Sequence, residues 1–395
     1  MTVPILKLKA GHVLPVWAGH PWVYAQALER SKSTPAAGAE VVLVDAKGNQ
    51  LGRGLYSPKS AIAVRLHGGP DVSLDAGLIA SRIAAADVLR AELGLVSGDN
   101  PGYRAVYAEG DALPGLVVDR LGDCLSVQFG TAGMKQRQAQ VITALLEQYS
   151  PKVILDLTPP IAAKLEGFEI GERVLHGELS DVQRFEELGI RYEIPSSLQQ
   201  KTGFYFDQRP LRERLMQLSQ GRRVLDTYCY TGSLGIAAAR GGASRVLAIE
   251  KNAEVVKAGK HCAHLNECDD RMEFRAGDAA DALAEAANNP YDIVICDPPK
   301  LAPQRKHKRV GLGKLRGIAK SGAKATRDGG LLVLSCCSGT IDIDDLTRAM
   351  ALGTRDAGYT AIVRERLFQG ADHPVSAAFR EGLYLKTLIV QLRRI

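Results

Sequence analysis

The chain has 395 residues, more than one hydrophobic core usually serves, so two or three domains are expected. Apolar residues make up 46% and charged residues 24%, an ordinary globular composition without an apolar run long enough to span a bilayer. The net charge is a mild +6. Because the first residues lack the apolar core of a secretory signal, we expect a cytoplasmic protein without a membrane partner.

Residues 1–70 have the pattern of short strands joined by turns. Apolar and polar residues alternate on both sides of Lys47-Gly48-Asn49, as they do in a β-hairpin. Aromatic residues stand beside Gly and Pro in "GHPWVY" (19–24). We predict a small β-barrel, whose aromatic side chains either stack on a ligand or fill the barrel core.

Residues 71–190 mix both element types. The segment "LIASRIAAADVLRAELGL" has helical periodicity. Two strand-like runs follow within 103–129, then a helix near "KQRQAQVITALLEQY" and strands near "KVILDL" and "ERVLHGEL". The order β-β-α-β-β predicts a small α+β domain.

Residues 191–395 alternate strand and helix. The segment "RRVLDTYCYTGSLGIAAARGGASRVLAIEKN" reads as strand, Gly-containing turn, Ala-rich helix and second strand. Further buried strands are expected at "YDIVICDPP", "GGLLVLSCCS" and "GLYLKTLIVQLRRI". This alternation predicts an α/β domain with a doubly wound, mainly parallel, Rossmann-like sheet.

Four acidic residues follow strands of this sheet in order. They are Asp226, Glu250, Asp278 and Asp297, and the turn after Asp226 lacks the G-x-G-x-x-G dinucleotide spacing. A carboxylate at the first strand end disfavours a pyrophosphate, whereas one near the tip of the second strand suits ribose hydroxyls. Each residue alone is often only a helix cap. Together they predict a crevice for S-adenosylmethionine.

The seven cysteines do not form a zinc pattern; "HCAHLNEC" (261–268) comes nearest, and its spacing fits one helix face poorly.

Asp297-Pro298-Pro299-Lys300 resembles the motif of amine methylation but lacks the aromatic residue that stacks on a base. A thiolate that adds to carbon 6 of a pyrimidine makes carbon 5 nucleophilic. Cys336 and Cys337 follow a buried strand, where only one of two neighbours faces the crevice; burial of both as apolar filler is the alternative.

Several segments then identify the chain as similar to the ribosomal large-subunit methyltransferase I family. They are "QQKTGFYFDQR", "YTGSLGIAA", "DPPK", "CSG" and "ADHPVSAAFREGLYLK", in this order. The resemblance covers nearly the whole chain. It implies a class I methyltransferase domain over 191–395, a PUA-like RNA-binding domain over 1–70 and a central domain over 71–190, with synthesis of 5-methylcytidine in 23S rRNA.

The resemblance also implies roles for single residues. Cys337, directly before Ser-Gly, would be the nucleophile, with Asp297 on the edge of the cytosine ring, while Cys336 would be structural. Residues 201–209 would form a lid over the cofactor. The implied cofactor-binding set is Asp226, Tyr228, Tyr230, Thr231, Gly232, Glu250, Lys251, Asp278, Asp297, Phe204, Phe206, Asp207, Gln208 and Arg209.

A basic segment supports an RNA partner. From Lys300 to Arg327 there are ten Lys or Arg residues and no Asp or Glu, which favours a polyanion, although a solvated loop gives the same pattern. Leu301 stands where the family usually has an aromatic residue, and "GLGKLRGIA" (311–319) also departs from its pattern. The expected RNA-contacting set is Pro298, Pro299, Lys300, Arg305, Lys306, Lys308, Arg309 and Trp22.

We therefore expect an S-adenosylmethionine-dependent enzyme that methylates carbon 5 of a cytosine. Its substrate would be 23S rRNA or a large-subunit precursor, and a homodimer is one option for its assembly. Two other functions stay open: methylation of a different base, such as guanine N2, or of a small molecule by the same fold, and a non-catalytic RNA-binding role in ribosome assembly.

Overall fold

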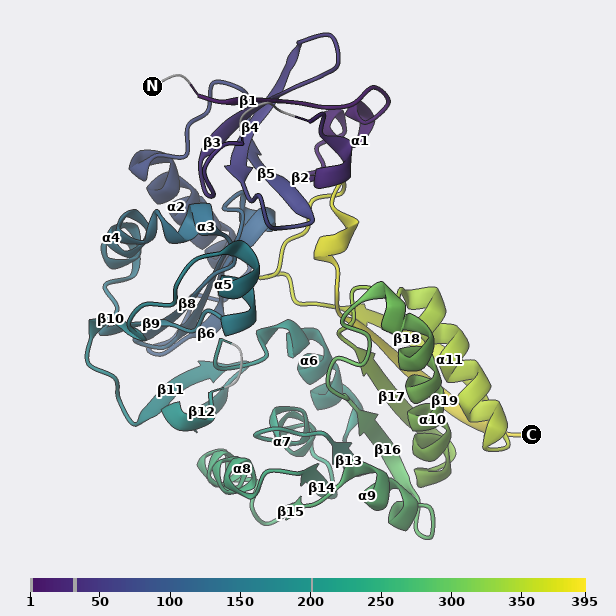
Figure 1. Cartoon of the computed structure of the whole chain (residues 1–395). Coiled ribbons are helices and arrows are strands. Elements are labelled where there is room, and N and C mark those ends of the chain that lie inside the picture. Colours follow the sequence, from purple (N-terminus) through teal and green to yellow (C-terminus); the bar gives the residue numbers. More distant parts are fainter. Residues whose placement is uncertain (1–2, 31–33, 200–201) are drawn as a thin grey trace. The chain divides into compact units, whose positions relative to one another are not determined.

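The computed structural model describes residues 3–30, 34–199 and 202–395 (Figure 1). The chain folds into two compact units, each formed by segments distant in sequence. The first comprises Met1–Phe185, Gln199–Phe206 and Ala371–Gly382, and the second comprises Glu186–Leu198, Asp207–Gly370 and Leu383–Ile395. Within the described ranges, no helix is long and apolar enough to cross a membrane.

The first unit begins with a five-stranded sheet in the order β1-β3-β4-β5-β2. The predicted hairpin pairs β3 with β4 antiparallel, and the Asp45 carboxylate holds its turn by accepting the amides of Lys47 and Asn49, both at 2.8 Å. Gly48 has a φ of +93°, which favours glycine at this turn. The elements are β1 (Ile5–Lys7), α1 (Val13–Trp17), β2 (Trp22–Tyr24), β3 (Glu40–Val44), β4 (Gln50–Tyr56) and β5 (Ile62–Gly68).

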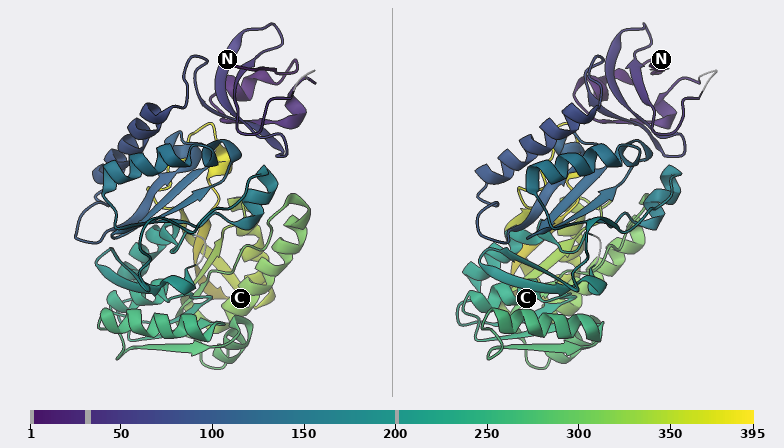
Figure 2. Two further views of the ribbon diagram at one scale, coloured as in Figure 1. Left: turned by 60° about the vertical axis from the view of Figure 1, so that its left-hand side comes forward. Right: turned by 90° about the vertical axis from the view of Figure 1, so that its left-hand side faces the viewer.

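A second sheet of the same unit has the order β10-β9-β8-β7-β6. Residues 102–129 form three strands where the sequence predicted two, because the chain turns tightly at Gly122, whose φ is +63°. Helices α2 and α4 lie along this sheet, and their apolar side chains complete its core (Figure 2). The elements are α2 (Ala76–Glu92), β6 (Gly102–Tyr107), β7 (Leu116–Leu121), β8 (Cys124–Phe129), α3 (Ala132–Lys135), α4 (Gln138–Tyr149), β9 (Val153–Asp156), α5 (Pro160–Glu166) and β10 (Val174–Gly177).

The second unit contains a seven-stranded sheet in the order β15-β14-β13-β16-β17-β19-β18. The first five of these strands are parallel, whereas β19 pairs antiparallel with both β17 and β18. This is the predicted doubly wound sheet. Its strands are β13 (Arg223–Thr227), β14 (Arg245–Glu250), β15 (Met272–Ala276), β16 (Tyr291–Cys296), β17 (Thr326–Cys336), β18 (Tyr359–Phe368) and β19 (Lys386–Arg394).

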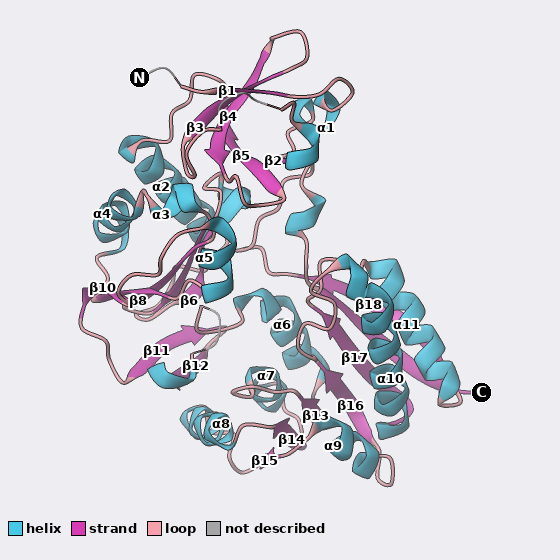
Figure 3. Cartoon of the chain, in the orientation of Figure 1, coloured by secondary structure: helices cyan, strands magenta, loops and turns pink. Residues whose placement is uncertain are grey.

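Helices cover both faces of this sheet (Figure 3). The core on one face joins apolar side chains of α9, α10 and α11 to those of the central strands, which are buried on both sides and therefore read as continuous apolar runs. The helices are α6 (Arg209–Leu218), α7 (Ser233–Arg240), α8 (Ala253–Leu265), α9 (Ala279–Ala286), α10 (Lys308–Ala325) and α11 (Ile343–Asp356). A hairpin of β11 (Val182–Glu187) and β12 (Ile190–Pro195) precedes them.

Candidate active site

The four predicted carboxylates lie at one edge of the seven-stranded sheet. Asp226 is the penultimate residue of β13, Glu250 ends β14, Asp278 follows β15 and Asp297 directly follows β16. Because these strands are parallel and adjacent, their carboxyl ends share one edge. In α/β sheets this edge, at the point where the strand order reverses, is where ligands bind.

Asp226 and Thr231 carry buried polar atoms that lack a partner within the described part of the chain. Asp226 Oδ2 accepts the Gly235 amide at 2.9 Å, but Asp226 Oδ1 and Thr231 Oγ1 accept or donate no hydrogen bond. Burial raises the pKa of Asp226 to about 8, with further contributions from Asp297 and Glu250. Buried polar atoms of this kind fit a bound group with a cationic, hydrogen-bonding end, as the amino acid part of S-adenosylmethionine has.

The loop after β13 is built from unusual backbone conformations. Tyr228 and Tyr230 have φ values of +60° and +52°, and Gly232 has +77°. A Cβ on Gly232 would lie 2.5 Å from Phe274 Cζ, so glycine is needed here for space as well as for conformation. Strained non-glycine residues of this kind cluster at ligand sites. Burial raises the pKa of Tyr228 to about 12.

Glu250 is tied into this loop by backbone hydrogen bonds. Its Oε2 accepts the Tyr230 amide at 3.1 Å and its Oε1 accepts the Asn252 amide at 3.0 Å. A carboxylate retains further acceptor capacity beyond these two bonds. Asp278 Oδ1 caps α9 by accepting the Ala280 amide at 2.8 Å. Asp278 is exposed, as is Lys251, which directly follows Glu250. The predicted ribose contact of Glu250 and the predicted cofactor contacts of Asp278 and Lys251 stay predictions.

Asp297 is half-buried and held by a neighbouring loop. Gln208 Nε2 donates to Asp297 Oδ2 at 2.9 Å, and the adjacent Asp207 accepts from the Tyr384 hydroxyl at 2.5 Å. Gln208 and Asp207 are themselves buried. The buried Gln208 side chain therefore helps to fix the orientation of Asp297.

The two adjacent cysteines have different surroundings. Cys336 is only 3% exposed and belongs to the core beneath α10 and α11, whereas Cys337 is half-buried, directly past the end of β17. In the parallel register Cys296 is paired with Leu334, so Asp297 and Cys337 leave the sheet at the same edge. The turn after Cys337 is fixed because Ser338 Oγ accepts the Ala302 amide at 3.1 Å.

Lys386 lies beside this turn and was not among the predicted site residues. Its side chain is buried, and Nζ donates to the carbonyl oxygens of Ser338 at 2.9 Å and Tyr384 at 2.7 Å. Burial lowers its pKa, and it interacts electrostatically with both cysteines. The pairing of Lys386 with Cys336 across β17 and β19 brings it there. The sequence signal that could have identified it is a lysine interrupting an apolar strand.

Three predicted lid residues have structural contacts in the described chain. Phe204 and Phe206 are 2% and 0% exposed, and both rings pack on Phe185, at 4.9 and 5.6 Å between centroids. Arg209 Nη2 lies 3.2 Å from Glu187. These contacts within the protein account for the positions of the three side chains without a ligand. Their binding of the cofactor therefore stays a prediction. Lys201 lies outside the described residues.

Some of the expected RNA-contacting residues are exposed, and others are buried or paired within the protein. Pro299, Lys300, Arg305, Lys306 and Arg309 are exposed, whereas Pro298 is buried and Lys308 Nζ lies 2.5 Å from Asp345 Oδ2.

Trp22 is also engaged within the protein. Its indole N–H donates to Glu109 at 2.8 Å, and its ring lies edge-on to Phe379 at 4.6 Å between centroids. By contrast, Trp17 on α1 is 78% exposed and is the more accessible stacking surface of the two.

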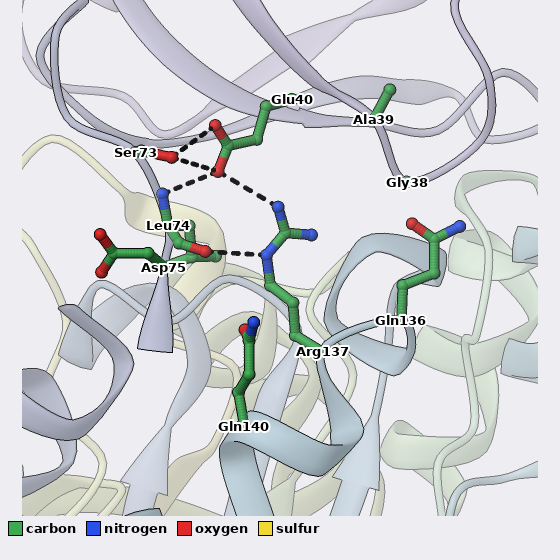
Figure 4. A pocket seen from close by; sticks show the side chains of 9 residues that line it. All are labelled: Gly38, Ala39, Glu40, Ser73, Leu74, Asp75, Gln136, Arg137 and Gln140. Carbon is green, nitrogen blue, oxygen red and sulfur yellow. Dashed lines mark hydrogen bonds and ion pairs between the residues drawn. The ribbon is translucent and has the colours of Figure 1, made fainter. Parts of the chain in front are cut away.

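A separate pocket of about 520 Å³ lies in the first unit between β3, the segment before α2, and α4 (Figure 4). Its central charge, Glu40, accepts from the Leu74 amide at 2.7 Å, from Ser73 Oγ at 3.0 Å and from Arg137 Nη2 at 3.1 Å. These groups form hydrogen bonds with one another, and they connect β3 to the segments before α2 and α4. We therefore assign the residues around this pocket a structural role within the unit. Within the described ranges, no group of three metal-binding side chains occurs.

Comparisons with known proteins agree with this geometry. Residues 6–67 match the PUA-like domain family, and residues 170–374 match the S-adenosylmethionine-dependent methyltransferase family. The crystal structure of SMU.776 complexed with SAH has a TM-score of 0.84 with 18% identity, and covers 99% of this chain and 100% of that one. This likeness shows the fold.

Relatives of named function match this chain over nearly its whole length. The ribosomal RNA large subunit methyltransferase I of Shewanella amazonensis is 32% identical over 98% of this chain and 99% of its own. The protein of the same name from Tolumonas auensis is 32% identical over 94% and 95%, and that from Escherichia coli O139:H28 is 31% identical over 96% and 97%. The cofactor is S-adenosylmethionine. The chain belongs to the ribosomal RNA large subunit methyltransferase I family and is an S-adenosylmethionine-dependent rRNA methyltransferase.

Proposed function

We propose that the chain methylates carbon 5 of a cytosine in 23S rRNA through a covalent bond between Cys337 Sγ and carbon 6 of the ring. The observation that carries the proposal is the position of Cys337, a half-buried residue directly past the end of β17, at the same edge of the sheet as Asp297, Asp226 and Glu250. This edge belongs to an rRNA methyltransferase, which makes an RNA base the expected substrate there. A cytosine inside a helix must be flipped out to reach it.

The proposed chemistry assigns a task to each residue. The Cys337 thiolate adds to carbon 6, and the electron pair of the ring shifts so that carbon 5 becomes nucleophilic. Asp297, oriented by Gln208, hydrogen-bonds the N3/N4 edge of the ring and favours its protonation as the sulfur adds. Carbon 5 would then take the methyl group, and the sulfonium sulfur that gives it up would leave as a neutral thioether. Loss of the carbon 5 proton to a base and departure of the Cys337 thiolate from carbon 6 restore the aromatic ring.

S-adenosylmethionine, when bound, supplies an electrophilic methyl group on its sulfonium. The residues that would hold it are Asp226 and Thr231, each with a buried polar atom that has no hydrogen-bond partner in the described chain, and Glu250 on the neighbouring strand. We also propose a cytoplasmic location, where the rRNA substrate is made. A homodimer stays an untested prediction.

Methylation of another RNA base is the alternative. It is favoured by Leu301, which replaces the aromatic residue that usually follows the Asp-Pro-Pro-Lys segment in the family. Mass analysis of 23S rRNA from a deletion strain separates the two. Loss of 5-methylcytidine supports the proposal, and loss of methylguanosine with unchanged 5-methylcytidine contradicts it.

Two substitutions test the covalent step. We expect Cys337→Ala to abolish transfer of labelled methyl groups to 23S rRNA, because the other cysteines of the described chain are buried, while the cofactor affinity measured by calorimetry changes less than twofold. Cys336→Ser is the matched control, since its side chain lies in the core, and we expect it to retain activity. An inactive Cys336→Ser together with an active Cys337→Ala would assign the nucleophile to the other sulfur.

A further inference from the structure

Helix α10 has one buried and one exposed face. Gly311, Leu315, Ala319 and Gly322 lie in or against the core beneath it. The exposed stripe, which we call the α10 face, repeats at intervals of three and four residues and so follows one side of the helix. It consists of Arg309, Gly313, Lys314, Gly317, Lys320 and Lys324.

The two glycines in the middle of this face have no packing explanation. A Cβ on Gly313 or Gly317 would meet no atom within 4 Å, whereas one on Gly311 would lie 2.9 Å from Ala302 and one on Gly322 would lie 2.7 Å from Leu332. A glycine inside a helix costs about 1 kcal/mol relative to alanine. The folded chain alone therefore gains nothing from Gly313 and Gly317, but they leave the helix backbone open to close approach.

Cations surround these glycines. Arg309, Lys314 and Lys324 make no ion pair with a carboxylate of the described residues. Two other cations of the helix do: Lys308 with Asp345, and Arg316 with Asp356 at 2.7 Å.

Lys320 interacts with a carboxylate only at longer range. It makes no ion pair within 4.0 Å in the described chain, yet its charge contributes to lowering the pKa of Asp356. The cations of the α10 face therefore keep their positive charges available to a ligand, whereas Lys308 and Arg316 of the same helix are paired with carboxylates.

The α10 face starts beside the candidate active site. The segment from Asp297 leads through the exposed Arg305 and Lys306 into the first turn of α10, at the carboxyl edge of the sheet. From there the helix runs about 27 Å away from that edge. A long ligand whose reacting group lies at this edge can continue along the helix.

We propose that the α10 face binds the sugar-phosphate backbone of the RNA strand that carries the target base. The row of like charges matches phosphates, and the glycines allow the backbone to lie against the helix. A protein partner would need an apolar centre, but Val310 is the single large apolar side chain exposed among the described residues of this helix. The RNA identity rests on the proposed function; the polyanion contact rests on the helix itself.

The test measures binding of a full-length 23S rRNA transcript over a series of KCl concentrations. Each phosphate contact contributes about 0.9 to the slope of log affinity against log salt. We expect Lys320→Gln/Lys324→Gln to lower the affinity about tenfold or more and the slope by about 2. The matched control is Lys257→Gln/Lys260→Gln on the exposed side of α8, with the same change in net charge and no expected loss of affinity.

The glycines give an independent test. We expect Gly313→Ala/Gly317→Ala to raise the melting temperature, because helix propensity improves, and to lower the RNA affinity at least fivefold, because the added methyl groups displace the backbone. Unchanged cofactor affinity shows that the site is intact. A stabilised double variant with wild-type RNA affinity, or a lysine pair that behaves like the α8 control, overturns the proposal.

Failure of this inference is distinguishable from failure of the proposed function. If the wild-type protein forms 5-methylcytidine while all α10 variants bind RNA normally, the α10 face is not the contact surface. If the wild-type protein forms no 5-methylcytidine but the α10 variants lose RNA affinity, the contact surface stands and the target base is a different one.

Discussion

At the scale of single residues, the alternation of side chains along a strand separates the two cysteines. The sequence showed that only one of Cys336 and Cys337 can face the crevice, and the structure places Cys336 in the core and Cys337 at its margin. Lys386 was not predicted because it is 49 positions from Cys337 in sequence. Only the antiparallel pairing of β17 with β19 brings it to the turn.

The position of Lys386 leads to a prediction about the reactivity of Cys337. A buried ammonium group near the thiol favours the thiolate, and Lys386 also orders the turn through the Ser338 carbonyl. We expect Lys386→Met to lower the turnover at pH 7 at least tenfold and to shift the pH dependence of Cys337 alkylation by iodoacetamide to higher pH.

The conservative variant separates charge from packing. Lys386→Arg retains the charge, so we expect it to restore the alkylation profile at least in part. A profile that Lys386→Met leaves unchanged, with activity lost all the same, would mean that the lysine acts only through the structure of the turn.

At the scale of elements, the sequence predicted long, buried strands better than half-exposed ones. The apolar runs that became β16 and β17 were identified because both of their faces are covered. Strand β18 was missed because its residues, "YTAIVRERLF", include charges on the edge of the sheet and only its first residue is buried. The β11–β12 hairpin was missed for a similar reason, since charged residues alternate along it.

The start of α11 gives a prediction at this scale. Asp342 Oδ1 accepts the Asp345 amide at 2.8 Å, and Asp345 reaches back to the Asp342 amide, which forms a capping box. We expect Asp342→Ala to destabilise the second unit by about 1 kcal/mol. Urea unfolding followed by circular dichroism measures this change.

Asp344→Ala is the matched control, because Asp344 is exposed in the same first turn but does not cap the helix. An equal loss of stability in both variants would assign the effect to the favourable interaction of any carboxylate with the helix N-terminus instead of to the cap.

At the scale of the whole molecule, position in the sequence does not decide which unit a segment joins. The sequence suggested boundaries near residues 70 and 190, and these stay predictions. The compact units instead assign Ala371–Gly382 to the first one. Asp372 explains this assignment, because its carbonyl accepts from Arg90 Nη2 at 2.7 Å and its carboxylate accepts the Arg104 amide at 3.1 Å. Such contacts between distant residues leave no periodic signal.

Each unit contains one buried group whose titration opposes that of the other. His67, in the first unit, has both ring nitrogens buried without a hydrogen bond in the described chain, and burial lowers its pKa to about 4. The charges of Arg82, Arg137 and Arg53 act in the same direction, against Glu40. Asp226, in the second unit, has its pKa raised to about 8.

These shifts give the two units opposite responses to acid. Below pH 6.5 the unfolded state protonates His67 and the folded state does not, so the first unit loses stability as the pH falls toward 4. The folded state keeps Asp226 protonated up to about pH 8, so the second unit loses stability as the pH rises from 4 to 8. Between pH 8 and pH 5 we expect the first unit to lose about 2 kcal/mol and the second to gain roughly 4 kcal/mol from these groups.

Differential scanning calorimetry of the cofactor-free protein at pH 8 and pH 5 checks the prediction. Two substitutions assign the transitions: His67→Phe, which removes no hydrogen bond, should flatten the pH dependence of one, and Asp226→Asn that of the other. Asp226→Asn should also raise the transition temperature of the second unit at pH 8, because it removes a buried negative charge that has no counter-charge in the cofactor-free protein. The same substitution should weaken the binding of S-adenosylmethionine, because that carboxylate would pair with the positive charge of the ligand. Two transitions that move together with pH, and that neither substitution flattens, would show that other groups control the acid response of both units.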